Sequence, residues 1–166
     1  MKKSIKWLRS IGIIGLIALI VIQFVPVELN NQGYESVLAF EEETQLSPEL
    51  AAVFKANCYD CHSNQTQYPW YSSVAPINLW LEEHVADGKK HFNVSQWPEY
   101  SVKRKDHKLE ELIEEVEETE MPLPSYTWVH GNLSDNERQA LIDWAQMARL
   151  SYRMEQEAQA AQPEVN

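Results

Sequence analysis

An apolar run without a polar face follows the first ten residues of the chain. Residues 11–27, IGIIGLIALIVIQFVPV, contain no charged side chain, and four basic residues among the first ten precede them. Roughly 17 apolar residues lie at the short end of the length that crosses a bilayer as a helix. We therefore expect a transmembrane signal anchor over residues 1–28, with its basic flank in the cytoplasm and the rest of the chain exported. A cleaved signal peptide would export the same domain.

Beyond residue 28, hydrophobic residues recur at helical spacing. The segment 106–120 carries four apolar residues on one helical face: Leu109, Leu112, Ile113 and Val116. Further helices are expected from Pro48 through both cysteines, over residues 77–87 before Gly88, and after the capping box of Ser134 and Glu137. No alternating run of strand type occurs beyond Glu28. The pattern predicts an all-α domain.

Composition divides the exported part into three segments. Residues 29–45 are polar and acidic and are expected to form a tether, residues 46–152 the folded domain, and residues 153–166 a polar tail. Long loops are expected at 63–76, 89–101 and 121–132. Because long loops are uncommon in a small domain, they indicate that something other than protein side chains fills its centre.

The charge balance narrows the set of partners. The chain has 14 basic and 25 acidic residues, a net charge of −11. Such a domain is not expected to bind nucleic acid, and it suits a partner protein with a basic docking face. The alternative is that the acidic residues only keep the protein soluble.

Both cysteines of the chain lie in CYDCH, residues 58–62. On a helix, Cys58, Cys61 and His62 are three and four positions apart, so their side chains share one face. Two thiols on that face can form thioethers with the two vinyl groups of a porphyrin while the imidazole reaches the iron. Cys-x-x-Cys-His is the signature of c-type haem attachment.

Three other interpretations of CYDCH fit less well. Zinc would need two further ligands from His84, His91, His107 and His130, at a spacing that matches no known finger. A thioredoxin-like redox pair expects strands, which the pattern does not predict. A disulfide would suit an exported domain but would leave His62 without a role.

Beyond this motif, the chain resembles the c-type cytochromes. Phe54 lies one turn before Cys58, and Trp144 occupies the place of the aromatic residue in their last helix. The segments CYDCHSN, YPWY, HVADGKKHFNVSQW and EMP also resemble a small membrane-bound haem-binding domain family of bacteria. The likeness extends from about residue 46 to residue 150, and it implies a cytochrome c-like helical domain with long loops around a haem.

The resemblance also implies roles for individual residues. Cys58 and Cys61 would hold haem c covalently, and His62 would be the proximal iron ligand. Pro76 in APINL would orient that histidine through its carbonyl group. Met121 in EMP would be the sixth ligand, with His84 as its main rival. Independently of the resemblance, the aromatic residues Tyr68, Trp70 and Trp80 are candidates for the wall of the haem site, with ordinary core and loop packing as the alternative.

These features predict a single-pass protein of the bacterial cytoplasmic membrane, with its haem domain on the extracytoplasmic side. Its expected function is single-electron transfer to or from a redox partner, and no enzymatic activity is expected. The alternative is a haem-based sensor or interaction module, in which the sixth coordination position is open or weakly held. A peroxidase would need a distal acid–base pair, which the sequence does not identify.

Overall fold

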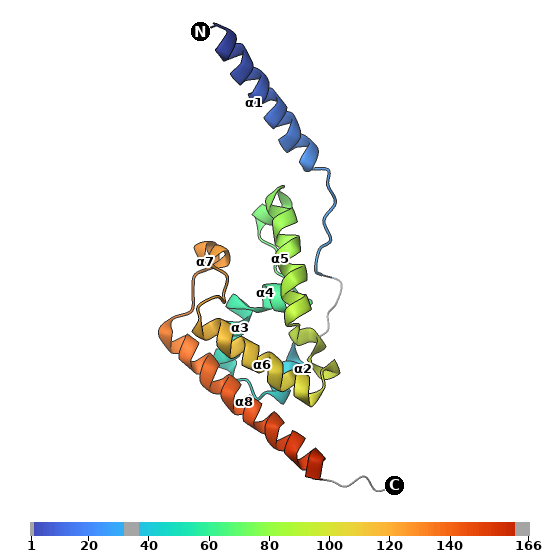
Figure 1. Ribbon diagram of the computed structural model, residues 1–166, viewed down its shortest axis with the longest axis vertical. Coiled ribbons are helices and arrows are strands. Elements are labelled where there is room, and N and C mark those ends of the chain that lie inside the picture. Colours follow the sequence, from blue (N-terminus) through green and yellow to red (C-terminus); the bar gives the residue numbers. More distant parts are fainter. Residues whose placement is uncertain (1, 32–36, 162–166) are drawn as a thin grey trace.

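The computed structural model describes residues 2–31 and 37–161. Within those residues the regular elements are all helices, which confirms the prediction of an all-α fold (Figure 1). In chain order they are α1 (Lys2–Ile22), α2 (Leu38–Glu43), α3 (Pro48–Asn57), α4 (Tyr59–His62), η1 (Trp70–Ser73), α5 (Ile77–His91), η2 (Val94–Glu99), α6 (Val102–Glu117), α7 (Pro124–His130) and α8 (Asp135–Ala161).

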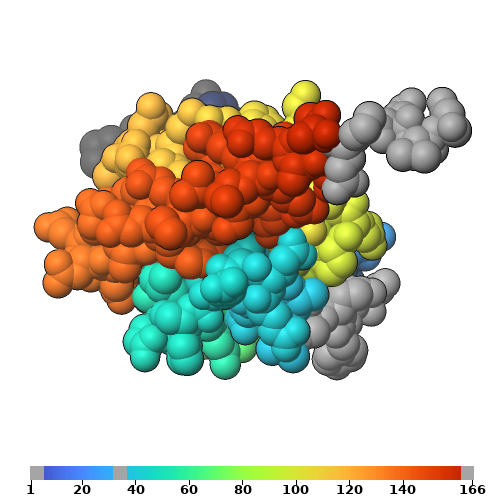
Figure 2. Space-filling view, turned by 90° about the horizontal axis from the view of Figure 1, so that it is seen from below, coloured from blue at the N-terminus to red at the C-terminus, as the bar shows by residue number. Residues whose placement is uncertain are grey.

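The longest helix of the domain, α8, packs along α6. Their facing sides bury the apolar residues of both helices: Leu109, Ile113, Val116, Leu141, Ile142, Ala145 and Ala148. The Arg149 guanidinium ties the helices together through Asp106 (2.8 Å) and Glu110 (2.7 Å). In Figure 2, α8 runs across one face of the molecule and α2 and α3 lie beneath it. The amphipathic pattern of residues 106–120 therefore predicted the right face of α6.

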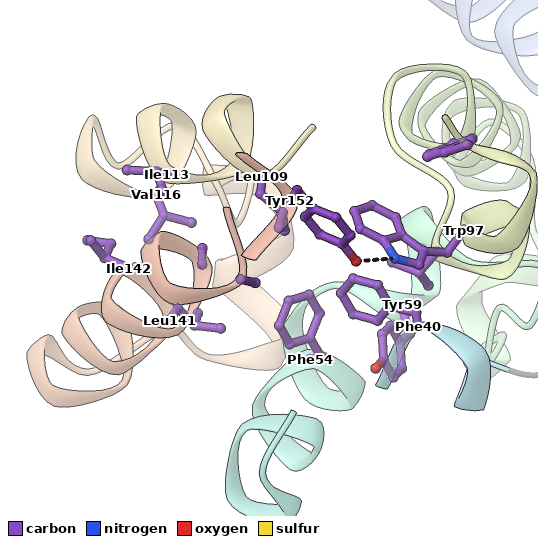
Figure 3. Close-up of a cluster of buried hydrophobic side chains, with 14 of the residues drawn as sticks. Phe40, Phe54, Tyr59, Trp97, Leu109, Ile113, Val116, Leu141, Ile142 and Tyr152 are labelled. Carbon is purple, nitrogen blue, oxygen red and sulfur yellow. Dashed lines mark hydrogen bonds between the residues drawn. The ribbon is translucent and has the colours of Figure 1, made fainter. Parts of the chain in front are cut away.

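An aromatic cluster joins this helix pair to the remaining helices. Phe40 of α2 is fully buried, and its ring makes edge contacts with Phe54 (5.4 Å), Trp97 (5.0 Å) and Trp144 (5.8 Å). The Trp97 indole donates a hydrogen bond to the Tyr152 hydroxyl (3.2 Å; Figure 3). The contacts of Phe40 bring α2, α3, η2 and α8 into one core.

This core corrects two predicted boundaries. Residues 29–45 were expected to form an acidic tether, yet α2 contributes Phe40 and Thr44 to the interior, because one apolar side of a short helix suffices to bury them. The tail expected from residue 153 is helical as far as Ala161. Residues 32–36 and 162–166, which belong to the same two segments, lie outside the described residues.

Other element boundaries also differ from the prediction. The helix predicted over 77–87 continues through Gly88 to His91, and the segment expected as a loop at 121–132 contains α7. The helix that begins at Pro48 ends at Asn57, because Cys58 leaves the helical conformation (φ −125°) before α4 begins. The Ser134–Glu137 capping box is confirmed, with the Glu137 N–H donating to Ser134 Oγ (3.3 Å) and Ser134 N–H to Glu137 Oε2 (2.8 Å).

The N-terminal helix α1 is attached to the domain at its C-terminal end. The Gln23 side-chain amide forms two hydrogen bonds with the Ala75 backbone, one to its carbonyl group and one from its N–H, each 3.0 Å long. Among the helices of the described residues, none is both long and apolar enough to cross a membrane, so the span predicted over residues 1–28 lacks support.

Candidate functional site

The CYDCH segment forms a single helical turn after a break in the chain. The Cys58 carbonyl group accepts hydrogen bonds from the N–H groups of Cys61 (3.2 Å) and His62 (2.9 Å). This turn brings Cys58, Cys61 and His62 to the wall of one cavity, which the three-and-four spacing predicted. Both cysteines are free thiols.

The His62 ring is held by the C-terminal end of α5. Its Nδ1 lies 3.0 Å from the Gly88 carbonyl oxygen and 2.9 Å from the Phe92 carbonyl oxygen. Because carbonyl groups only accept hydrogen bonds, we assign the proton to Nδ1, which leaves the Nε2 lone pair for a metal ion. Burial lowers the pKa of His62 despite these two hydrogen bonds. The imidazole is therefore neutral and oriented, as a metal ligand requires.

The carbonyl groups that orient His62 are not the one expected. Pro76 was assigned this role by resemblance, but its carbonyl oxygen accepts from the Trp80 N–H (3.2 Å) in the first turn of α5. The acceptors lie at the other end of the same helix. The Gly88 carbonyl oxygen also accepts from the Phe92 N–H (2.9 Å), and the Phe92 carbonyl group lies just past the end of the helix. The assignment of Pro76 is therefore corrected to Gly88 and Phe92.

Gly88 allows this approach because it has no side chain. A Cβ atom on Gly88 would lie 2.7 Å from the Cys61 carbonyl oxygen and 3.1 Å from the Cys61 Cβ atom. Sequence reasoning placed Gly88 at a helix end and missed this role. A glycine inside a helical pattern was the available signal, because it often marks a close backbone contact.

A buried polar network fastens the motif to η2. The Asn64 N–H donates to Ser95 Oγ (3.0 Å), and the Asn93 side-chain amide donates to Asn64 Oδ1 (3.0 Å). Asn93 Oδ1 in turn accepts from the Ser95 N–H (3.1 Å). The network explains why the residues after CYDCH and the segment NVSQW belong together: it fixes Phe92, and thus one of the two acceptors of His62.

The segment that follows α1 also binds to this region. The Asn30 N–H donates to the Tyr68 hydroxyl (2.8 Å), and its side-chain amide donates to the Ser63 carbonyl oxygen (2.8 Å). Lys89 Nζ donates to Asn30 Oδ1 (2.5 Å). Tyr68 therefore fastens the chain after α1, and it does not line the cavity, although it was expected in the haem wall.

The two thiols are protonated at neutral pH. Burial raises the pKa of Cys58 to about 12, with a smaller effect from Cys61. Burial also raises the pKa of Cys61 to about 11, with a smaller effect from Asp60. A redox-active thiol needs a lowered pKa, so the raised pKa values of both cysteines disfavour the thioredoxin-like interpretation.

The cavity beside the motif has a volume of about 1010 Å³, the upper end of the roughly 300–1,000 Å³ range of small-molecule sites. Its lining comes from six parts of the fold: the end of α3, the CYDCH turn, α5 with the following Phe92, α6, the segment from Met121 to Tyr126, and Leu133 and Leu141 near the start of α8. Apolar walls are supplied by Phe54, Phe92, Leu112, Val116, Leu123, Leu133 and Leu141. The cavity can accept a large, flat, mostly apolar ligand.

Both candidates for the sixth ligand line this cavity. Met121 belongs to the turn after α6, where its N–H donates to the Glu115 carbonyl oxygen (3.1 Å), and His84 belongs to α5. The structure thus brings both candidates to the same cavity as the CYDCH motif. It does not distinguish which of the two would be the sixth ligand.

Two residues expected in the haem wall lie elsewhere. Trp70 is among the most exposed side chains of the domain (84%), and Trp80 is exposed and packs at a tilt against the His84 ring (4.3 Å between centroids). Neither residue lines the cavity. Their placement in the wall is corrected.

Tyr126 is a cavity residue that sequence reasoning missed. Its hydroxyl donates to the Ala56 carbonyl oxygen (2.9 Å) and approaches Asp60 Oδ2 (3.2 Å), so it connects α7 with the CYDCH turn. Its ring stacks on His130 (4.2 Å between centroids). No pattern singled out Tyr126, because it lies in a segment interpreted as an extended loop.

The side chains at the cavity fit a haem better than a zinc ion. In the described part of the chain, no three His, Cys, Asp or Glu residues converge as a metal site of zinc type would require. Two neutral thiols beside an oriented imidazole, at the wall of a large apolar cavity, instead fit a haem.

The all-helical domain with this cavity fits a small haem-binding domain. The model of the family described as haem-binding domain matches residues 17–147 of the chain, and the protein belongs to that family. Comparison with curated proteins and with solved structures returned no match.

Proposed function

We propose that the protein holds haem c covalently and transfers single electrons. The observation that carries the proposal is that Cys58, Cys61 and His62 line one cavity while two carbonyl groups fix the His62 tautomer. Each thiol would add its S–H bond across one vinyl group, which forms a thioether without loss of electrons. His62 Nε2 would bind the iron. The bound group would supply a one-electron change between ferric and ferrous iron.

We further propose Met121 as the sixth ligand. Met121 lines the cavity, and its segment comes just before the last helix, as in the c-type cytochromes that the chain resembles. A thioether ligand favours electron transfer over the binding of external ligands. The protein itself then needs no acid–base residue, so no enzymatic activity is proposed. His84 is the rival ligand.

The cellular setting is part of the proposal. The basic and then apolar N-terminus would hold the protein in the bacterial cytoplasmic membrane, with the haem domain on the extracytoplasmic side. The acidic side chains at the cavity suit a redox partner with a basic docking face. They are Asp60, Glu83, Asp87, Glu111, Glu114 and Glu115, and they outnumber Lys90 and Lys108.

Covalent attachment is tested by expression with the c-type maturation machinery and an alkaline pyridine spectrum. Wild type should show the spectrum of haem with two thioethers. Cys58→Ala and Cys61→Ala should each give a one-thioether spectrum or lose haem, and His62→Ala should lose stable haem incorporation. His107→Ala is the matched control, because His107 is exposed and lies outside the cavity. Haem content like that of wild type in all three site variants would exclude the proposed site.

The sixth ligand is tested by spectroscopy of the oxidised protein. Wild type should show the weak long-wavelength band of sulfur-to-iron ligation, and Met121→Ala should abolish it, lower the reduction potential and admit carbon monoxide after reduction. Met147→Ala is the control, because Met147 is an exposed methionine of α8. If His84→Ala opens the iron and Met121→Ala does not, the ligand is His84. Ready binding of carbon monoxide by wild type would favour the haem-based sensor.

A further inference from the structure

We propose that the end of the domain next to α1 rests on the lipid bilayer through an uncharged surface, which we call the aromatic seat. The seat consists of Trp70, Val74, Ile77 and Trp80. The inference rests on the membrane anchoring proposed above and goes beyond it, because it assigns the orientation of the haem domain and a second contact with lipid.

The first observation is a gap in the charge pattern. In a chain in which 23% of the residues are charged, no Asp, Glu, Lys or Arg occurs from residue 61 to residue 81. This stretch forms η1 and the first turn of α5, and it contains all four residues of the seat. Uncharged stretches of this length are expected inside a core, yet much of this one is at the surface.

The second observation is exposure. Trp70 is 84% exposed, and Val74, Ile77 and Trp80 are also exposed. Val74 leads directly into α5 through the Asn78 N–H to Val74 carbonyl hydrogen bond (3.1 Å), and Ile77 and Trp80 are one turn apart on that helix. Trp70 belongs to η1, which packs against α5. Exposed large apolar residues that gather in this way mark a contact surface.

The third observation fixes which surface covers the seat. The paired hydrogen bonds between Gln23 and Ala75 hold the C-terminal end of α1 next to Val74 and within two residues of Ile77. Two residues of chain span at most about 7 Å. Figure 1 shows α1 leaving the molecule at the end where η1 and the first turn of α5 lie. If α1 lies in the bilayer, the seat lies at its surface.

The chemistry of the seat suits lipid. Tryptophan is enriched where a membrane meets water, because its ring is apolar and its indole N–H can bond to head groups. An acidic domain is repelled by an anionic bilayer surface, so the part of it that contacts the bilayer should carry no charge. His84 lies four positions after Trp80 in α5, about 6 Å along the helix axis, so this contact would also hold the cavity wall close to the membrane.

The proposal is tested with the full-length holoprotein in nanodiscs of phosphatidylcholine. Single cysteines carrying a nitroxide are introduced by Ile77→Cys, by Trp70→Cys, by Leu16→Cys in α1 and by Met154→Cys in α8. Wild-type protein is treated with the nitroxide reagent in the same way, to determine how much label reacts with Cys58 or Cys61. Met154 is the matched control, since it is an exposed apolar residue of α8, whose C-terminal end lies at the opposite end of the molecule from α1 (Figure 1). The measured quantity is collision with oxygen relative to collision with a water-soluble nickel chelate.

Labels at residues 16, 70 and 77 should show an oxygen-to-nickel ratio several-fold higher than the label at residue 154. Ratios at 70 and 77 equal to that at 154, with a lipid-like ratio at 16, would overturn the seat and leave the anchoring intact. A water-like ratio at residue 16 would overturn the anchoring and the seat with it. Dipolar broadening between labels at residue 77 would show a second copy on this surface and would also overturn the proposal. Trp70→Cys keeps the test decisive should Ile77→Cys disturb α5.

Discussion

Gly88 lies so close to Cys61 that a Cβ atom on Gly88 would stand 2.7 Å from the Cys61 carbonyl oxygen. The same glycine offers its own carbonyl oxygen to His62 Nδ1 at 3.0 Å. One residue thus sets both the distance between α5 and the CYDCH turn and the orientation of the imidazole. The contact is backbone to backbone, so no side-chain rotation can relieve it.

Gly88→Ala should therefore separate α5 from the CYDCH turn. Overpacking of this kind costs about 1–3 kcal/mol, which outweighs the gain of about 1 kcal/mol in helix propensity. We expect a lower free energy of unfolding of the holoprotein and a changed reduction potential, because the hydrogen bonds to His62 Nδ1 lengthen. Denaturant titration and potentiometry measure the two effects.

Gly15→Ala is the matched control for this substitution. Gly15 also lies in a helix, but nothing stands within 4 Å of the position of its Cβ atom. Its alanine variant should keep the stability and the reduction potential of wild type. Equal behaviour of the two variants would show that the contact between Gly88 and Cys61 does not hold the site.

Phe54 should be a major source of stability. It is fully buried and packs edge-on against Trp144 at 5.3 Å, and both residues are among those that carry the resemblance to c-type cytochromes. Phe54→Ala leaves a cavity between α3 and α8 and should lower the free energy of unfolding by about 3–5 kcal/mol. Trp128→Ala, at a residue that is 83% exposed, should change it by less than about 0.5 kcal/mol. A loss below 1 kcal/mol for Phe54→Ala would contradict this view of the core.

Asn93 should couple η2 to the CYDCH turn. Its side chain is buried and connects Asn64 with the Ser95 N–H. Asn93→Ala removes an acceptor from that buried N–H group, at a cost of about 1–3 kcal/mol. The variant should also lose haem faster on dilution into an acceptor protein, because Phe92 is less firmly placed. Asn132→Ala, at an exposed asparagine with a local hydrogen bond to Leu133, should retain haem as wild type does.

The thiols of the haem-free chain should react slowly with alkylating agents. The pKa of Cys61 rises from an ordinary 9.0 to about 11, so at pH 8 its thiolate fraction is roughly 100-fold lower than in an unfolded chain. Iodoacetamide modification followed by mass spectrometry should show this difference with and without urea. Equal rates in both conditions would mean that the site does not form before haem is attached.

The same shifts predict how the stability of the haem-free chain depends on pH. The folded state keeps the thiol protons to higher pH than the unfolded state, because burial raises the pKa of both cysteines. The unfolded chain therefore binds fewer protons between pH 9 and 11, and the free energy of unfolding should fall as the pH rises through that range. Alanine at both cysteines should remove this part of the pH dependence, as measured by urea unfolding.

Local patterns were sufficient for several features of this protein. The apolar spacing of Leu109, Ile113 and Val116 predicted the buried face of α6, and the capping box predicted the start of α8. The spacing of Cys58, Cys61 and His62 predicted that they share one wall of a site. These features depend on residues within one or two helical turns, where sequence distance and spatial distance agree.

These local patterns could not predict the short helices or which of their residues are buried. The segment LAFEEE of α2 has too few residues to show a period, so the burial of Phe40 became visible only when α3, η2 and α8 surrounded it. Trp70 and Trp80 are the reverse case. Their aromatic character suggested a cavity wall, but in the folded chain both are exposed and neither lines the cavity.

The sequence by itself determined the helical class, the haem-binding family and the Cys-x-x-Cys-His pattern, because each depends on residues that are close together in the chain. Only the tertiary structure decided which carbonyl groups orient His62. Pro76 and Gly88 lie at opposite ends of α5, and both could offer an acceptor. The crossing of α5 and the CYDCH turn at Gly88 selects the C-terminal end, since a contact between two backbones depends on the packing of whole helices and leaves no periodic trace in the chain.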